Sequence, residues 1–109
     1  MHFVYLINVE NTDIYKIGFS RKNPELRKDK LKTGNSYKLV VTKTYQSHRA
    51  KKVENILHNR LLSKKYTEDA KLSGEWFLLG AHDVLGFMDM CKQIESQLEF
   101  LEKNSTLFD

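Results

Sequence analysis

Three stretches of the chain carry apolar residues in the pattern of β-strands. Residues 3–9 and 14–19 are rich in β-branched and aromatic residues, and the turn-forming segment Asn11-Thr12-Asp13 lies between them. This pattern predicts a β-hairpin over residues 3–20. Residues 37–45 alternate and are rich in valine and threonine, which predicts a third strand.

The first predicted helix begins at Asn23-Pro24-Glu25. Asparagine can cap a helix, proline suits the first turn, and glutamate favours the positive end of the helix dipole. We expect this helix to reach about Thr33, because Gly34-Asn35 supplies a left-handed stop.

Two further helices are predicted. Ser47 can cap the second, which is expected to reach about Ser63 and to bury an apolar stripe. Asp83 can cap the third, which is expected to end near Lys103. Between them, residues 64–73 are polar and predict a loop, and the apolar run 74–79 predicts a short strand or an anchored turn.

The order of these elements is β-β-α-β-α-α, with one further short element before the last helix. We therefore predict a single α+β domain over residues 1–109, built on a mostly antiparallel sheet. The length of 109 residues and the 40% of hydrophobic residues are sufficient for one packed core.

Charge is distributed unevenly along the chain. Residues 1–79 carry 16 Lys and Arg against 8 Asp and Glu, a balance of +8, whereas residues 80–109 carry 2 against 6, a balance of −4. A basic body attracts polyanions. A solvated lysine-rich surface accounts for the same composition, so charge alone leaves both interpretations open.

The chain has one cysteine, Cys91, which excludes an internal disulfide framework and is typical of a reducing environment. No apolar run approaches the roughly 18 residues of a membrane span. The segment Met1-His2-Phe3-Val4-Tyr5 lacks the basic region of a signal peptide. We therefore expect a cytoplasmic protein without a membrane partner.

Two tyrosines lie on the predicted hairpin, Tyr5 on its first strand and Tyr15 on its second. An alternating aromatic residue usually belongs to the core. Gly18 is less ordinary, because glycine inside a strand often marks a place where another group approaches closely. The hairpin register is not fixed by the sequence, so the adjacency of the two hydroxyls is an expectation.

Arg27 precedes Leu31 by four residues, so both lie on about the same helix face. Its planar guanidinium could grip a phosphate at the sheet edge, or its stem could lie flat over apolar surface.

Glu54 and His58 lie one turn apart at the border of the apolar stripe of the second helix. A carboxylate there could bind Mg²⁺, which often takes one or two carboxylates and keeps water and phosphate as its other ligands. His58 could act as a general acid or base. The alternatives are a surface pair of Glu54 with His58 or a lysine, and a zinc pair, which lacks a third ligand.

The last helix carries apolar residues at three- and four-residue steps. This stripe is expected to pack on the domain itself, with Cys91 as part of the core, and a weak homodimer through this helix is the other interpretation. The stripe consists of Val84, Phe87, Cys91, Ile94, Leu98 and Leu101.

Together these segments resemble the GIY-YIG nuclease superfamily. Val4-Tyr5-Leu6 stands at its first motif and Tyr15-Lys16-Ile17-Gly18 at its second. The resemblance is closest to a phage and bacterial subgroup in which residues 27–35, 54–58 and Gly74-Glu75-Trp76-Phe77 follow in this order. It covers about residues 3–79. Val4 replaces the glycine of the first motif, and Lys16 separates the tyrosine from the isoleucine of the second.

The resemblance implies a three-stranded antiparallel sheet flanked by helices, and hydrolysis of nucleic-acid phosphodiester bonds with a single divalent ion, for which we expect Mg²⁺ or Mn²⁺. It implies catalytic roles for Tyr5, Tyr15 and Arg27, and Glu54 as the metal ligand. We expect DNA rather than RNA as the substrate, and His58 as a further catalytic residue in place of a family histidine whose position holds Leu31. Since tyrosine has an ordinary pKa near 10, a nearby cation would have to lower it for the tyrosine to act as a base.

Nucleic acid is expected on the basic residues, with two accessory residues at the site. The basic residues are Lys16, Arg21, Lys22, Lys28, Lys30 and Lys32, and the accessory residues are Gly18 and Glu75. The alternatives are a catalytically weak or inactive nucleic-acid-binding module, and a phage-type protein-interaction factor on the same fold.

Overall fold

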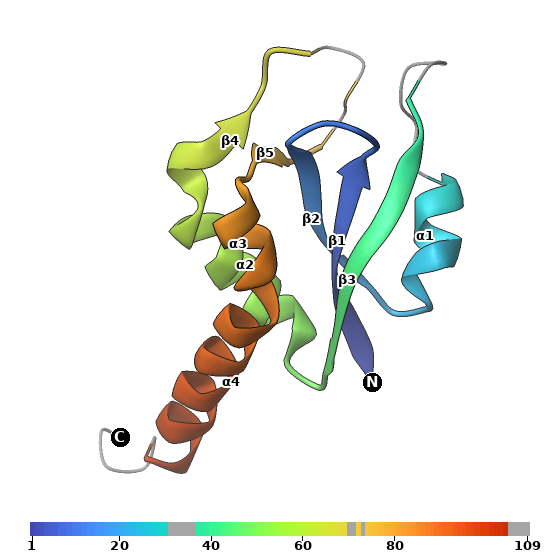
Figure 1. Ribbon diagram of the computed structural model, residues 1–109. Coiled ribbons are helices and arrows are strands. Elements are labelled where there is room, and N and C mark those ends of the chain that lie inside the picture. The colour runs from blue at the N-terminus through green and yellow to red at the C-terminus, as the bar shows by residue number, and fades with distance from the viewer. Residues whose placement is uncertain (31–36, 70–71, 73, 105–109) are drawn as a thin grey trace.

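A five-stranded antiparallel sheet forms the centre of the molecule in the computed structural model, which describes residues 1–30, 37–69, 72 and 74–104 (Figure 1). The spatial order of the strands is β3-β1-β2-β5-β4, and each neighbouring pair is antiparallel. The strands are β1 (His2–Val9), β2 (Ile14–Ser20), β3 (Leu39–Ser47), β4 (Lys65–Tyr66) and β5 (Trp76–Leu78).

The α+β class is confirmed, whereas the prediction of three strands is wrong. Residues 65–66, expected in a loop, form β4 and pair with β5, and β5 in turn pairs with the start of β2. Strands of two and three residues are too short to show an alternating pattern, so their pairing could not be recognised in the sequence.

The predicted hairpin of β1 and β2 is confirmed. Its turn holds Asn11 at a φ of 63°, a left-handed conformation that asparagine tolerates better than most residues. The hydroxyl of Thr12 donates to the carbonyl of Val9 at 2.6 Å and accepts from the amide of Ile14 at 3.0 Å. The resulting register pairs Leu6 with Ile17.

The helices are α1 (Pro24–Lys30), α2 (Ala50–Arg60), a 3₁₀ turn at Leu62–Lys64, α3 (Ala81–Leu85) and α4 (Phe87–Lys103). The predicted start of the first helix is confirmed, because the side-chain oxygen of Asn23 accepts from the amide of Glu25 at 2.9 Å. Its predicted end, together with Leu31, lies outside the described residues. Ser47 is the last residue of β3 rather than a helix cap, and its hydroxyl accepts from the amide of Arg49.

The single helix predicted over residues 83–103 is wrong, because α3 and α4 meet at Gly86. Asp83 lies inside α3 instead of preceding it, and its carboxylate accepts from the amide of Gly80 at 3.1 Å. Asp83 therefore stabilises the start of the helix from within its first turn.

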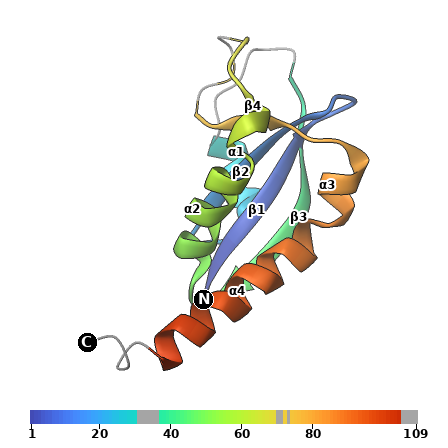
Figure 2. The same cartoon turned by 90° about the vertical axis from the view of Figure 1, so that its left-hand side faces the viewer.

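Helices cover both faces of the sheet. Helix α1 packs on β1 and β3 on one face, and α2 and α4 pack on the other (Figures 1 and 2). The main core lies under α2 and α4 and includes the fully buried Cys91, as predicted. None of the helices in the described part of the chain has the length and apolar character that a membrane span requires.

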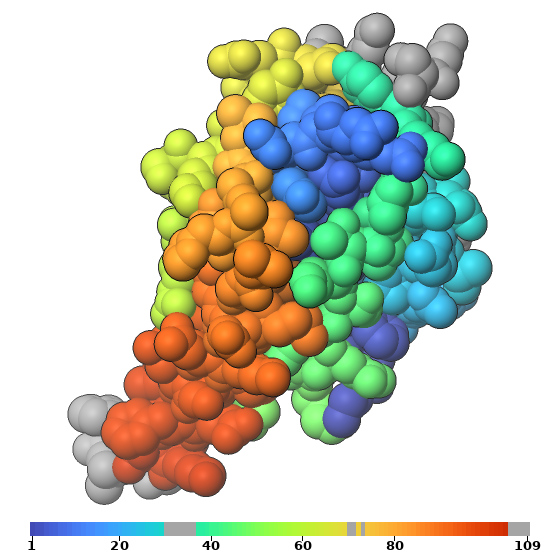
Figure 3. All heavy atoms as spheres, viewed as in Figure 1, coloured from blue at the N-terminus to red at the C-terminus, as the bar shows by residue number. Residues whose placement is uncertain are grey.

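The C-terminal turns of α4 extend beyond the sheet (Figure 3). Phe87, Cys91 and Ile94 of the predicted stripe are buried, but Leu101 is 58% exposed because no strand lies beneath it. The expected stripe therefore ends before its last position.

The carboxylate of Glu95 joins α4 to the end of β3 and the start of α2. It accepts hydrogen bonds from the hydroxyls of Tyr45, at 2.8 Å, and Ser47, and from the Arg49 guanidinium at 2.9 Å. Burial alone would raise the pKa of Glu95, but the bonds from Ser47, Tyr45 and Arg49 outweigh it and hold that pKa below its ordinary value.

Replacement of Glu95 by alanine is expected to lower the free energy of unfolding by about 2 kcal/mol, because three donors lose their acceptor. Urea unfolding measures this loss. Since the pKa is depressed in the folded state, the contribution is present at neutral pH and is lost as the pH falls below about 4. The matched control Glu99→Ala, an exposed carboxylate 3.8 Å from Arg49, should change stability by less than about 0.5 kcal/mol. Equal losses in the two variants would contradict this role of Glu95.

Candidate active site

A cleft of about 390 Å³ opens where β2 continues past its short partner β5. Within the described ranges β5 pairs only with Ile14, Tyr15 and Lys16, so the rest of β2 has no strand on that side. Residues from the sheet, from α1 and α2 and from the segment before β5 line this cleft: Tyr5, Lys16, Ile17, Gly18, Phe19, Arg27, Lys51, Glu54, His58, Gly74 and Glu75.

Tyr5 reaches the cleft because its cross-strand partner is Gly18. A Cβ atom built on Gly18 would overlap the hydroxyl oxygen and ring carbons of Tyr5. The missing side chain therefore makes room for the phenol to lie across β2. Tyr5 is 1% exposed in total but still lines the cleft.

Tyr15 does not join Tyr5, so the expected adjacency of the two hydroxyls is wrong. The pairing of Tyr5 with Gly18 places Tyr15 on the opposite face of the sheet, where it packs against the main core. Lys16, one residue later, lies on the same face as Tyr5 and lines the cleft. The structure thus brings a lysine to the position where a second tyrosine was expected.

Lys16 is 9% exposed and lies under the segment that precedes β5. Its ammonium group lies 5.5 Å from the ring centroid of Trp76. Gly74 has a φ of 91°, a conformation that side chains rarely allow, and a Cβ atom there would also come within 2.6 Å of the Lys16 nitrogen, so glycine is favoured above it. Burial, reinforced by the charge of Arg27, lowers the pKa of Lys16.

Glu54 brings a buried carboxylate from α2 to the same cleft. It is 6% exposed, and one of its oxygens accepts from the Lys51 ammonium at 3.2 Å. Its negative charge favours the protonated forms of both Tyr5 and Lys16, although burial and Arg27 leave the pKa of Lys16 lowered. No hydrogen bond to its second oxygen is found among the described residues.

The donor set restricts which metal the cleft could hold. Over residues 1–30, 37–69, 72 and 74–104, no group of three His, Cys, Asp or Glu side chains is placed to hold an ion. A zinc site made of protein ligands is therefore not found in that part of the chain. One carboxylate fits a magnesium site, in which water and substrate phosphate supply the other ligands.

Arg27 approaches Tyr5 from α1 on the other side of the cleft. Burial raises the pKa of the Tyr5 hydroxyl, and the hydrogen bond and charge of Arg27 oppose that rise without cancelling it. Tyr5 is therefore a protonated phenol at neutral pH. Arg27 itself is exposed and could meet a phosphate that enters from solvent.

His58 and Glu75 form a polar bridge at the end of the β2–β5 pairing. Nε2 of His58 lies 2.7 Å from the carbonyl oxygen of Ile17, and Nδ1 contacts the carboxylate of Glu75. Both ring nitrogens of His58 are therefore engaged, one with a backbone carbonyl and one with a carboxylate. This arrangement suits it to position the segment around Glu75 rather than to take a proton.

The predicted nucleic-acid contacts are distributed unevenly. Arg21 and Lys22 line an adjoining pocket of about 360 Å³ that shares Arg27 with the cleft. Lys28 pairs with Glu25 at 3.0 Å instead of lining the cleft. Lys30 closes α1, and Lys32 lies outside the described residues.

Lys51 was missed in the sequence, and Lys16 was assigned only to nucleic-acid binding. A usable signal was present for Lys16: a lysine between Tyr15 and Ile17 in an apolar strand must bury most of its length. Lys51 gave no such signal, because it lies on the exposed side of a helix with many charges.

Replacement of Gly18 by alanine is expected to displace the Tyr5 ring and to lower the free energy of unfolding by about 2 kcal/mol. In a Tyr5→Ala background the same substitution should cost little, because the overlapping atoms are gone. A double-mutant cycle in urea measures this coupling. Additive losses would show that the two residues do not contact each other.

Comparison with known proteins places the chain in a family. No curated protein and no solved structure matches it. One family model, the T5orf172 domain, matches residues 2–92 and so includes every residue that lines the cleft. The chain belongs to the T5orf172 domain family.

Proposed function

We propose that this protein is a metal-dependent endonuclease of the GIY-YIG type that hydrolyses phosphodiester bonds, with DNA as its substrate. The observation that supports this most directly is the convergence of Tyr5, Lys16, Arg27 and Glu54 in one cleft from four different elements. The T5orf172 domain is a nuclease-like domain of phages, which favours the same class of reaction.

The charges of the cleft suit a phosphodiester. Lys16, Arg27 and Lys51 face a site whose buried carboxylate is Glu54. Hydrolysis of a phosphodiester requires alignment of a water molecule and stabilisation of the negative charge that builds up on the phosphate oxygens. Arg27, at the exposed side of the cleft, is placed to bind those oxygens.

Glu54 is the residue that would hold a divalent ion, through the carboxylate oxygen that Lys51 leaves unbonded. When bound, such an ion supplies polarisation of the phosphate and stabilisation of the leaving oxygen. Mg²⁺ and Mn²⁺ both accept this oxygen-based coordination.

Lys16 and Tyr5 divide the work on the attacking water. The lowered pKa of Lys16 increases the share of neutral amine at a given pH, whereas the raised pKa of Tyr5 keeps its hydroxyl protonated. In its neutral form Lys16 takes a proton from water, the resulting hydroxide attacks phosphorus, and the bond to the leaving oxygen breaks as that oxygen takes a proton from solvent. The hydroxyl of Tyr5 donates a hydrogen bond that orients the water.

Three variants should each lower the rate of cleavage of supercoiled plasmid by at least about 100-fold: Glu54→Gln, Tyr5→Phe and Arg27→Ala. Each removes a group from the cleft but leaves most of the basic surface, so duplex affinity should change by less than about three-fold. Cleavage is measured with Mg²⁺ or Mn²⁺, and affinity by fluorescence anisotropy in EDTA.

The matched control is Glu10→Gln, which makes the same chemical change in the β1–β2 turn and should cleave normally. Binding without cleavage by the native chain would show a nucleic-acid-binding module instead of a nuclease. If the native chain neither binds nor cleaves DNA, a protein-interaction factor is favoured.

Lys16→Arg and Lys16→Met distinguish a proton acceptor from a fixed charge. If Lys16 takes the proton, both variants should lose about 100-fold in rate, because arginine keeps the charge but does not deprotonate. The native rate should rise with pH through the lowered pKa of Lys16, and this rise should disappear in both variants. Recovery of activity by arginine would contradict the proton-acceptor role.

A further inference from the structure

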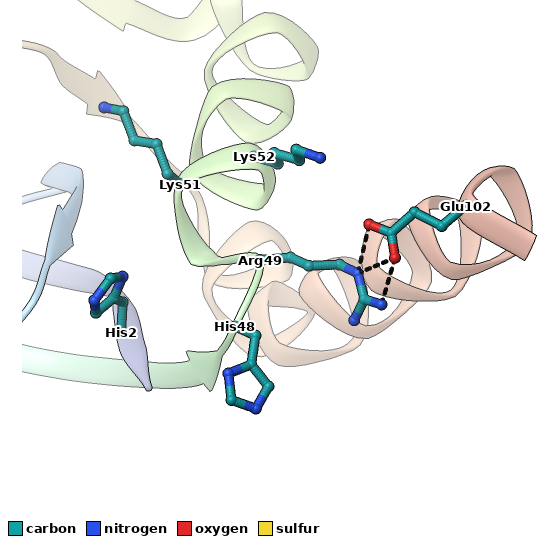
Figure 4. Close-up of a pocket in the computed structure, with 6 residues that line it drawn as sticks. All are labelled: His2, His48, Arg49, Lys51, Lys52 and Glu102. Carbon is teal, nitrogen blue, oxygen red and sulfur yellow. Dashed lines mark hydrogen bonds and ion pairs between the residues drawn. The ribbon is translucent and has the colours of Figure 1, made fainter. Parts of the chain in front are cut away.

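A further basic pocket adjoins the cleft at Lys51, and Figure 4 shows the residues that line it. Its volume is about 420 Å³. It forms where the start of β1, the turn between β3 and α2, the first turn of α2 and the end of α4 come together. Its lining residues are His2, His48, Arg49, Lys51, Lys52 and Glu102.

Arg49 does not supply the free positive charge of this pocket. It donates to Glu95 at 2.9 Å and to both carboxylate oxygens of Glu102, with a closest approach of 2.6 Å, and Figure 4 shows it pointing toward α4. The charges of Arg49 and Glu102 therefore largely cancel. The ammonium of Lys51 is bonded to Glu54 in the cleft. What remains for this pocket is the charge of Lys52 and two exposed histidines.

The pocket is continuous with the cleft through Lys51, which lines both. Phe19 connects the same two hollows: its ring lies 5.5 Å from the Lys51 ammonium and 5.3 Å from the ring of His2. An anionic chain that leaves the cleft past Lys51 therefore enters a second cationic pocket.

Another basic pocket adjoins the cleft. The pocket lined by Arg21 and Lys22 shares Arg27 and Phe19 with the cleft. Basic pockets thus adjoin the cleft both at α1, through Arg27, and at α2, through Lys51. This is the charge distribution expected for a polymer of phosphates that passes through the site rather than ending in it.

We infer that the pocket around His48 and Lys52 binds backbone phosphates of a nucleic acid next to the one in the cleft. The inference rests on the proposed function for its substrate class. It extends that function by assigning a binding site at the start of α2, so that the substrate is also held away from the reacting phosphate. Lys52 forms an ionic contact to the backbone, and His48 adds a hydrogen-bond donor.

The test uses the full chain with His48→Ala and Lys52→Ala combined. The matched control, His82→Ala with Lys92→Ala, removes the same two residue types from exposed positions on α3 and α4. Affinity for a fluorescent DNA duplex is measured in EDTA, so that no cleavage occurs, over a range of salt concentrations. Urea unfolding establishes that both proteins are folded.

We expect the pocket variant to bind about ten-fold more weakly. The slope of log affinity against log salt should become shallower by about 0.9, since one phosphate contact is lost. In cleavage assays KM should rise while kcat stays unchanged. The control should match the native protein in every measurement.

If the pocket variant has the same affinity and the same salt slope as the native protein, the inference is overturned, whatever the cleavage assay shows. A fall in both kcat and affinity with unchanged salt slope would also overturn it, because the pocket would then affect the cleft only indirectly. If the pocket variant loses affinity and has a shallower salt slope, but the native chain does not cleave DNA, the pocket is supported and the nuclease is rejected.

Discussion

The contact between Tyr5 and Gly18 is the constraint on which the candidate site depends. Their pairing fixes the register of the first hairpin, and the register decides which side chains share a face of the sheet. It gives Lys16 to the cleft and Tyr15 to the core. A shift of one residue would exchange these two side chains and remove the space in which the Tyr5 ring lies.

Around that contact, the helices on the two faces of the sheet supply opposite charges to one small volume. Helix α1 contributes Arg27, and α2 contributes the buried carboxylate of Glu54. Because Glu54 is paired with Lys51 and lies near Lys16, its burial does not leave an isolated charge. The cleft therefore keeps a carboxylate for a cation while remaining attractive to an anion.

The sequence predicted the α+β class, the first hairpin and the beginning of α1 because each has a strong local signal. It failed where structure depends on distant partners. Strand β4 exists only because β5 lies beside it, and Gly86 divides a helix whose apolar spacing continues across it. In the site, Tyr5, Arg27 and Glu54 lie together as expected. The face of the sheet on which Tyr15 lies depends on the strand register, which the alternating pattern does not specify.

The stretch of β2 without a partner strand also bears on how copies of the chain behave toward one another. An unpaired strand edge offers free amides and carbonyls on which a second molecule can add a strand, the usual beginning of aggregation. Here the Ile17 carbonyl is already occupied by His58, and Lys51 stands over Phe19. The side chains that line the cleft thus also cover part of a strand edge that could otherwise pair with another chain.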